Sequence, residues 1–492
     1  MRLSKSQYIR GLQCHKSLWL YRHRKNLIPE SSPSLQLIFD QGHRIGELAW
    51  QRFPGGCLIK EDYLHIPEAL KSTRTAETAG ERIIYEATAI HDRVLVRPDI
   101  LIRKGNAWDM VEVKGSTQVK DVYLDDVAIQ KYVLDGADFR IRKCFVMHVN
   151  NQYVRRGEIN ASRFFTLADV TKEAVALQKE IPARVSKMHK VLALKSAPNI
   201  SIGPHCTEPY ECEFMDHCWK HIPDYSVFDL IRIRHEKVAV LLDRDIMRIR
   251  DIPENFPLTQ PQELQVAVEK SGRPHIDRQE IAKCLREPRY PLHFIDFETI
   301  FPAIPPYDSI RPFQQIPFQA SLHVQKKKDG RAEHLEYLGD AKTDPRPGLV
   351  AFLTESIGPE GSVVAYNAPF EGARLGELAE AYPRHAKRLL SVKNRLWDIA
   401  SPFRMGLYVH PKFQGSWSIK AVLPALVPGM TYDGMTISNG GDASIAYLNL
   451  MDGQLSVTES KKIIRALRDY CGQDTMAMVK LLDVLHKEIG AR

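Results

Sequence analysis

A charged hairpin predicted between residues 94 and 115 constrains the fold of this sequence most strongly. Apolar residues alternate with polar ones on both sides of a turn at residues 104–106, as in two antiparallel strands. Glu112 and Lys114 are two residues apart and therefore point to one face of their strand, where Asp99 can meet them. Two carboxylates beside a lysine can bind a divalent cation and activate a water. The alternative is a surface hairpin with solvated charges, because short motifs of this kind often occur by chance.

The size and charge of the chain leave room for several domains and for an anionic partner. With 492 residues and 44% hydrophobic content, it is long enough for about three globular domains. The net charge of +8 suits a nucleic-acid partner without requiring one. Neither a signal peptide nor an apolar run of membrane-spanning length is evident, so we expect a cytoplasmic protein without membrane contact.

Two helices are predicted before the hairpin. The first covers residues 3–25, begins with a capping box formed by Ser4 and Gln7, and carries Cys14. The second extends from about residue 35 to 53 and places His43 on an apolar stripe. A histidine at such a position is either a core residue or, beside two carboxylates, an additional metal ligand.

Four cysteines are candidates for a metal centre. Cys206, Cys212 and Cys218 have five residues between each pair, and Cys14 lies at the other end of the same region. Four thiolates can hold a 4Fe-4S cluster or a tetrahedral zinc ion, and either would fasten the first helix to the end of the domain. The wide, even spacing favours the cluster, whereas Cys218 followed by His221 keeps zinc open.

The order of these elements resembles the RecB-type branch of the PD-(D/E)XK nucleases, specifically the CRISPR-associated and helicase-linked members that carry an iron-sulfur cluster. The elements, in chain order, are Cys14, His43, Asp99, Glu112-x-Lys114, Gln130 with Tyr132 on a predicted helix, and Cys206, Cys212 and Cys218. The resemblance implies that Asp99 and Glu112 bind Mg or Mn, that His43 adds a ligand and that Lys114 orients the attacking water. It also implies that Gln130 and Tyr132 contact the substrate, although family members usually space this pair four residues apart rather than two.

A second set of acids lies in the last third of the chain. Asp296 and Glu298 share one face of a predicted buried strand, and Glu371 follows another strand at a helix start. Tyr470 and Asp474 are four residues apart on a predicted helix and hence on one face. Four acids from three distant segments are what a two-metal phosphodiesterase needs.

This second set resembles the DnaQ-like exonucleases of the RNase H-like fold, in the variant with Tyr before the final acid. The segments RLWDIA and SIKAVLPAL are closest to the YprB-like branch. The resemblance implies that Asp296, Glu298, Glu371 and Asp474 bind metal and that the Tyr470 hydroxyl positions water. Glu371 stands where Asp is usual, and an inactive RNase H-like scaffold is the alternative.

The sequence therefore predicts an α/β protein with a PD-(D/E)XK domain at 1–222, a helical connector at 223–290 and an RNase H-like domain at 291–492. The combination resembles a bacterial family of unknown function that fuses these two domains. We expect a metal-dependent nuclease that cuts single-stranded or end-exposed DNA and trims 3′ ends, in repair, mobile-element handling or defence. The alternatives are an RNA-processing exonuclease driven by the C-terminal domain and a non-catalytic nucleic-acid-binding assembly subunit.

Overall fold

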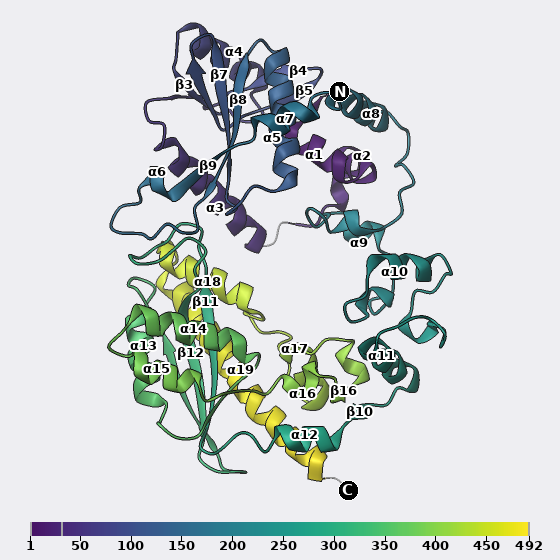
Figure 1. Ribbon diagram of the computed structural model, residues 1–492, viewed down its shortest axis with the longest axis vertical. Helices are drawn as coiled ribbons and strands as arrows, with labels where there is room; N and C mark the ends of the chain where they lie inside the picture. The colour runs from purple at the N-terminus through teal and green to yellow at the C-terminus, as the bar shows by residue number, and fades with distance from the viewer. Residues whose placement is uncertain (1, 31–32, 491–492) are drawn as a thin grey trace. The chain divides into compact units, whose positions relative to one another are not determined.

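Two separate mixed sheets organise the chain in the computed structural model, which describes residues 2–30 and 33–490 (Figure 1). Unit 1 comprises residues 1–221 together with 302–314, and unit 2 comprises 222–301 and 315–492. Both units combine helices with sheets, so the chain is an α/β protein. The segment 302–314 belongs to unit 1 although it follows a strand of unit 2 in the sequence.

The sheet of unit 1 has six strands and contains the predicted hairpin. The strand order is β2 (Cys57–Leu58), β3 (Ile83–Tyr85), β6 (Ile100–Lys104), β7 (Ala107–Lys114), β8 (Ile141–Val149) and β9 (Phe165–Asp169). A turn at Gly105 and Asn106 joins β6 to β7, with Gly105 at a φ of 64°, a backbone conformation that costs glycine little. The residues before Asp99 do not continue the hairpin. They form β5 (Val94–Val96), which pairs with β1 (Leu3–Ser4) and β4 (Ala89–His91) in a small second sheet.

Two helices cover the opposite faces of the six-stranded sheet. Ile129 and Val133 of α5 (Asp121–Gly136) belong to the same buried core as Met110 of β7. Ile45 of α3 (Pro33–Trp50) belongs to a second core with Val111, the neighbour of Met110. The face that carries Met110 also carries Glu112 and Lys114 because side chains alternate along a strand. The remaining helices of unit 1 are α1 (Lys5–Gln13), α2 (His15–His23), α4 (Ile66–Thr78), α6 (Ala161–Phe164), α7 (Thr171–Leu177), α8 (Ile181–Leu192) and α9 (Met215–Cys218).

The prediction of one helix over residues 3–25 is wrong. The capping box of Ser4 and Gln7 is present and begins α1, but Cys14 adopts an extended conformation with φ −159° and ψ 119°. This conformation ends α1, and α2 begins at the next residue. Cys14 therefore lies at a junction between two helices, where tertiary packing overrides the helical spacing of its neighbours.

The sheet of unit 2 has five strands, in the order β13 (Ala332–Leu338), β12 (Ile316–Gln325), β11 (Leu292–Ile300), β14 (Ser362–Ala365) and β15 (Leu396–Asp398). The central strand β11 runs antiparallel to β12 and parallel to β14. Ile295 and Phe297 of β11 enter a core with Leu349 of α13 (Arg346–Ser356) and Leu375 of α14 (Ala368–Ala381). Asp296 and Glu298 therefore point to the other face, which α19 (Val457–Gly490) contacts.

Short helices complete unit 2, including the predicted connector. Residues 223–290 contain α10 (His235–Leu242), α11 (Gln260–Ser271) and α12 (Arg278–Cys284), and β10 (His275–Ile276) in this segment pairs with β16 (Tyr408–Val409). The other helices of unit 2 are α15 (Ala386–Lys393), α16 (Ser401–Arg404), α17 (Ile419–Leu426) and α18 (Gly440–Asp452). Single 3₁₀ turns occur at Lys25–Leu27, Pro204–Cys206, Val227–Asp229, Ile249–Asp251 and Pro411–Phe413.

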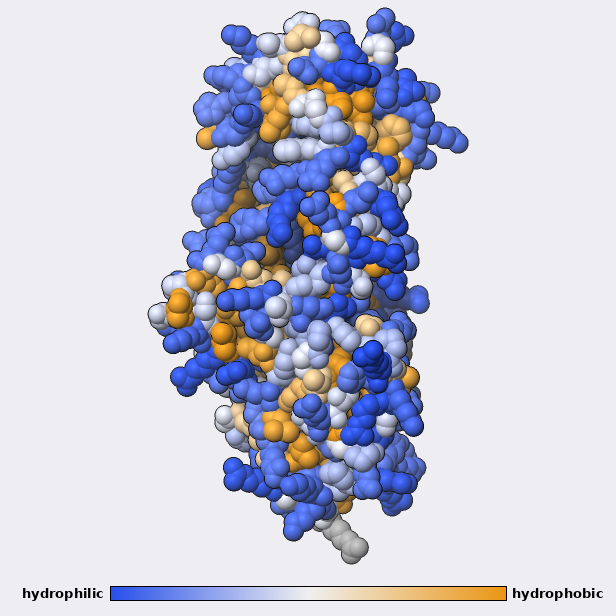
Figure 2. All heavy atoms as spheres, turned by 90° about the vertical axis from the view of Figure 1, so that its left-hand side faces the viewer, coloured by the Kyte–Doolittle hydropathy of each residue, from blue (hydrophilic) through white to orange (hydrophobic). Residues whose placement is uncertain are grey.

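The surface in view in Figure 2 is dominated by hydrophilic side chains, and hydrophobic ones gather only in small groups. Within residues 2–30 and 33–490, no helix combines the length and the apolar composition needed to cross a bilayer.

Candidate functional site

The two predicted acids of unit 1 meet across the hairpin. The register pairs Ile100 with Val111, which places Asp99 opposite Glu112. Asp99 Oδ2 accepts a hydrogen bond of 2.5 Å from the backbone N–H of Val113. Burial raises the pKa of Asp99, and repulsion between its negative charge and that of Glu112 adds to the rise.

Two lysines neutralise Glu112. Lys114 Nζ lies 2.8 Å from Glu112 Oε1 and 2.5 Å from Asp126 Oδ2. Lys5 Nζ, delivered by the first turn of α1, lies 2.6 Å from the same Glu112 oxygen and 3.2 Å from Asp126 Oδ1. Two ammonium groups and two carboxylates therefore form a closed network. Sequence reasoning did not select Lys5 or Asp126.

One of the two predicted substrate-contact residues joins this network. Gln130 Nε2 donates to Glu112 Oε2 at 2.7 Å and to Asp126 Oδ1 at 3.0 Å. Tyr132 instead donates to Asp92 Oδ2 at 3.4 Å. Residues two apart on an α-helix are rotated by about 200°, so the two side chains leave α5 in nearly opposite directions. The i, i+4 spacing of Asp126 and Gln130 was the sequence signal for Asp126.

Charge balance differs between the two predicted acids. Burial on its own would raise the pKa of Glu112, but Lys114 and Lys5 outweigh it and lower the pKa. Burial and the neighbouring Glu112 raise the pKa of Asp99 well above its usual value, and the lysines offset only part of this. Asp99 is therefore the acid whose charged form would gain most from an added cation.

The predicted ligand His43 lies outside this network. It is exposed on α3, whose core residues pack against the sheet face opposite to that of Glu112. His43 interacts electrostatically with Glu86, which also interacts with Glu112. Glu86 Oε2 lies 3.7 Å from Arg97 Nε. Among the residues that the structure describes, His43 makes no hydrogen bond or ion pair with Asp99 or Glu112, and its role as a ligand stays a prediction.

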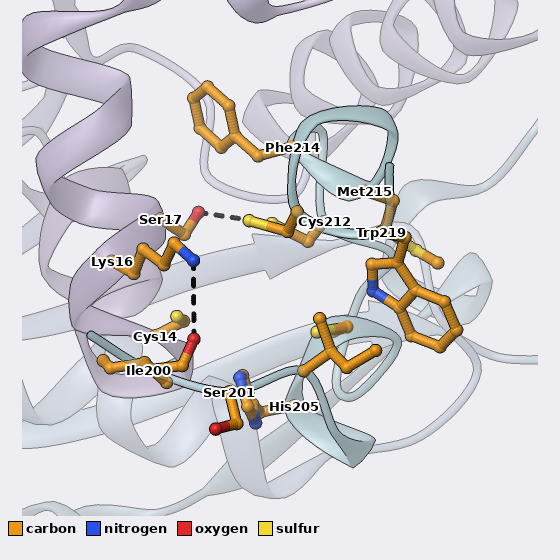
Figure 3. A pocket seen from close by; sticks show the side chains of 13 residues that line it. Cys14, Lys16, Ser17, Ile200, Ser201, His205, Cys212, Phe214, Met215 and Trp219 are labelled. Atoms are coloured by element: carbon orange, nitrogen blue, oxygen red, sulfur yellow. Dashed lines mark hydrogen bonds between the residues drawn. The ribbon is translucent and has the colours of Figure 1, made fainter. Parts of the chain in front are cut away.

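The four predicted cysteines line one pocket (Figure 3). Cys14 comes from the α1–α2 junction, Cys206 from a 3₁₀ turn, Cys212 from a loop and Cys218 from the end of α9. Burial raises the pKa of the Cys14 and Cys218 thiols, and the neighbouring sulfurs add to the rise. Positive charge from a bound metal would therefore stabilise their thiolate forms.

The spacing of these sulfurs tests which metal group fits. Four thiolates bound to one zinc ion at about 2.3 Å lie roughly 3.8 Å from one another. In the described part of the chain, no three of the four sulfurs come within 4.8 Å of one another. The described lining of the pocket contains His205 but not His221. The arrangement thus suits a four-thiolate group larger than a single zinc ion, such as a 4Fe-4S cluster.

Unit 2 brings all four of its predicted acids into one electrostatic cluster. Asp296 and Glu298 come from β11, Glu371 from the first turn of α14, and Asp474 from α19. Glu298 interacts with each of the other three, and Glu371 also interacts with Asp296. Glu371 is buried, and its Oε2 has no hydrogen-bond partner among the described residues. A buried carboxylate oxygen without a partner suits a metal ligand.

A thiol lies beside these acids. Cys471 Sγ is 3.6 Å from Asp296 Oδ2, and ligand atoms of Asp296, Glu298 and Cys471 all lie within 4.8 Å of one another. Cys471 is fully buried on α19, directly after Tyr470. Sequence reasoning did not select Cys471, because its contact with β11 depends on the tertiary fold.

Two tyrosines and a lysine surround Asp474. Tyr432 donates a hydrogen bond to Asp474 Oδ1, and Tyr470 also donates to this carboxylate. Lys420 Nζ lies 5.6 Å from the centre of the Tyr470 ring and 5.8 Å from that of Tyr432. Its charge acts on Asp474 and Glu298. Lys420 and Tyr432 were not predicted, although Lys420 belongs to the SIKAVLPAL segment.

Among the residues that the structure describes, none of the four acids of unit 2 forms an ion pair, and Lys420 acts on two of them only through space. Burial, followed by repulsion from Asp474, raises the pKa of Asp296 to about 8. Burial also raises the pKa of Asp474 to about 6, although hydrogen bonds from Tyr432 and Tyr470 and the charge of Lys420 limit the rise. Divalent cations would supply the missing positive charge, and carboxylate oxygens are the ligands that Mg and Mn prefer.

Comparison with known sequences finds one matching family model. Residues 293–418 match a domain of unknown function, DUF2779, a region that includes Asp296, Glu298 and Glu371 but ends before Asp474. This match covers less than half of the chain.

Three mycoplasma-type proteins are also similar to this chain. The Uncharacterized protein UU173 of Ureaplasma parvum is 27% identical over 208 residues, which cover 38% of this chain and 30% of that protein. The Uncharacterized protein MG366 of Mycoplasma genitalium and its homolog in Mycoplasma pneumoniae are each 26% identical, over 211 and 209 residues. Those matches cover 38% of this chain and 31% of each relative, so less than a third of each relative's length is shared.

Proposed function

We propose that this protein is a metal-dependent nuclease that hydrolyses phosphodiester bonds in DNA. The observation that carries the proposal is the convergence of Asp296, Glu298, Glu371 and Asp474, from three distant segments, into one largely buried cluster with Lys420 nearby. Burying so many like charges is costly unless cations compensate them. A polynucleotide strand supplies the phosphates that such a cation site acts on.

In unit 2 the four acids would hold the divalent cations, with Cys471 within reach of the same position. When bound, these cations would activate a water and stabilise the leaving oxygen. Tyr470 is anchored to Asp474 and can orient the water, while the Lys420 ammonium beside it can pair with a phosphate oxygen. The strand order β13-β12-β11-β14-β15, with β12 antiparallel to β11, supports the RNase H-like assignment.

In unit 1 we propose a PD-(D/E)XK nuclease site. Asp99 and Glu112 would hold one cation, and Lys114 would orient the attacking water. The hairpin register that sets Asp99 opposite Glu112 supports this assignment. The four cysteines would hold a 4Fe-4S cluster with a structural role, because they join the α1–α2 junction to residues 206–218.

Digestion of end-labelled substrates tests the proposal. Matched single-stranded DNA and RNA are incubated with Mg or Mn and with three proteins, namely the wild type, Lys114→Ala, and the double variant Asp296→Asn with Asp474→Asn. We expect the double variant to lose 3′ trimming and Lys114→Ala to lose the remaining cleavage while it still binds DNA. Digestion of RNA alone would favour an RNA-processing enzyme. Tight binding without any product, in protein purified without air, would favour a non-catalytic subunit and contradict the proposal.

A further inference from the structure

Lys5 is placed in the acidic network of unit 1 by the first turn of a nine-residue helix, α1. Its side chain is only 22% exposed, and its Nζ lies 2.6 Å from Glu112 Oε1 and 3.2 Å from Asp126 Oδ1. Lys114 contacts the same oxygen of Glu112. Glu112 is therefore held between two ammonium groups, of which only Lys114 is close to it in sequence.

The other end of α1 is attached to the cysteine-bearing segment. Gln13 Nε2 donates to the backbone carbonyls of His205 at 2.8 Å and Tyr210 at 2.7 Å. Arg10 Nη2 donates to Glu213 at 2.6 Å. Cys14, which follows Gln13, lines the pocket that contains the other three cysteines.

A helix of nine residues is about 13 Å long and moves as a rigid element. A shift of the segment around Cys206 and Cys212 would move Gln13 and Arg10, and with them the first turn that carries Lys5. We propose that Lys5 is a positioning residue of the unit 1 site and that the cysteine-bearing segment sets its place through α1. This inference rests on the proposed nuclease function of unit 1.

Lys5 would act through Glu112. Lys5 donates to the Oε1 atom of Glu112. The other oxygen, Oε2, accepts a hydrogen bond of 2.7 Å from the neutral amide of Gln130. The positive charge of Lys5 also opposes a divalent cation at Asp99 and Glu112. Loss of Lys5 should therefore tighten cation binding while it misplaces Glu112 for catalysis.

The affinity for Mn²⁺ distinguishes a positioning role of Lys5 at the unit 1 site from a purely structural role. The double variant Asp296→Asn with Asp474→Asn serves as the background, because it removes the cation site of unit 2. Mn²⁺ titrations followed by electron paramagnetic resonance are compared for Lys5→Met, Lys5→Arg, Gln13→Ala and Arg10→Met. Lys71→Met is the matched control, since Lys71 is an exposed lysine on α4 and lines neither the acidic network nor the cysteine pocket as described.

We expect Lys5→Met to bind Mn²⁺ about tenfold more tightly and to cut DNA more slowly. Lys5→Arg should retain most of the wild-type affinity. Gln13→Ala and Arg10→Met should shift the affinity in the same direction by a smaller factor, and Lys71→Met should leave it unchanged.

Unchanged Mn²⁺ affinity in Lys5→Met, or no Mn²⁺ binding in either protein, would overturn the role of Lys5. A shift in Lys5→Met without any shift in Gln13→Ala and Arg10→Met would overturn the link to the cysteine-bearing segment. If the expected shifts occur but no protein with an intact Lys114 cuts DNA, the placement of Lys5 stands and the nuclease function of unit 1 is wrong.

Discussion

The two acidic sites of this chain balance their charges in different ways. In unit 1, Lys5 and Lys114 neutralise Glu112 directly through ion pairs of 2.6 and 2.8 Å. In unit 2, four acids share one cluster, and Lys420 acts on Asp474 and Glu298 only through space. Unit 1 therefore carries most of its own counter-charge, whereas the proposed function requires cations from solution in unit 2.

The difference suggests a division of roles between the sites. A cluster that lacks counter-charge suits two divalent cations, which is the requirement of a two-metal phosphodiesterase. A balanced network leaves room for one cation at Asp99, the acid of unit 1 whose pKa is raised by burial and by Glu112. The following predictions compare the two sites under matched changes.

Glu371→Gln should cause the largest change, a loss of 3′ trimming of roughly a thousandfold, because a metal ligand contributes several kcal/mol to transition-state stabilisation. Glu371 is buried with an unpartnered oxygen. Glu377→Gln is the matched control, since Glu377 lies on the same helix and pairs with Arg374. Single-turnover kinetics on a 3′-labelled strand measures both. Equal rates for the two variants would remove Glu371 from the site.

Glu112→Gln should destabilise unit 1 by about 3–5 kcal/mol, because removal of one partner leaves two largely buried ammonium groups without their shared carboxylate. Calorimetry of the metal-free protein measures the loss. Asp62→Asn provides a control, because the ion pair of Asp62 with His65 is exposed and should contribute little. A Glu112→Gln variant as stable as the wild type would contradict the charge balance described for unit 1.

Mn²⁺ should stabilise unit 2 by about 2.7 kcal/mol when it is present at a hundred times its dissociation constant. The acids of this unit repel one another in the absence of cations, so binding favours the folded state. Thermal unfolding with Mn²⁺ and with a chelator measures the shift. The double variant Asp296→Asn with Asp474→Asn should lose the shift. If it retains the full shift, the stabilising cation binds elsewhere.

The last expected effect is a pH dependence of the stability of unit 2. Burial and Asp474 raise the pKa of Asp296 to about 8, and burial raises that of Asp474 to about 6. Folded unit 2 then binds protons more tightly than the unfolded chain does, so the associated stability is present at low pH and is lost as the pH rises through these values.

Metal-free wild type should therefore lose stability relative to Asp296→Asn between about pH 4 and pH 8. Unfolding curves of both proteins over this range, with a chelator present, measure the difference. A difference that is constant with pH would mean that Asp296 titrates normally.

Local spacing predicted the parts of these sites that lie within single elements. Period two placed Glu112 and Lys114 on one strand face, and period 3.6 placed Tyr470 and Asp474 on one helix face. The turn at Gly105 and Asn106 set the hairpin register that brings Asp99 to Glu112. These relations depend only on residues that are neighbours in the sequence or across one turn.

Residues supplied by distant elements could not be predicted in this way. Lys5 is 107 residues from Glu112, and Cys471 is 175 residues from Asp296. No periodicity links such pairs, because the packing of whole elements decides their contact. The break at Cys14 could not be predicted either, because the helical spacing of residues 3–25 gives no signal for the extended backbone that ends α1 there.

Anomalous scattering from crystals grown with Mn²⁺ would test whether the acids of unit 2 form a cation site. We predict a strong manganese peak next to the carboxylates of Asp296, Glu298 and Asp474. The peak should be absent in the double variant Asp296→Asn with Asp474→Asn. Crystals with saturating Mn²⁺ and no peak at these three side chains would contradict the two-metal interpretation of unit 2.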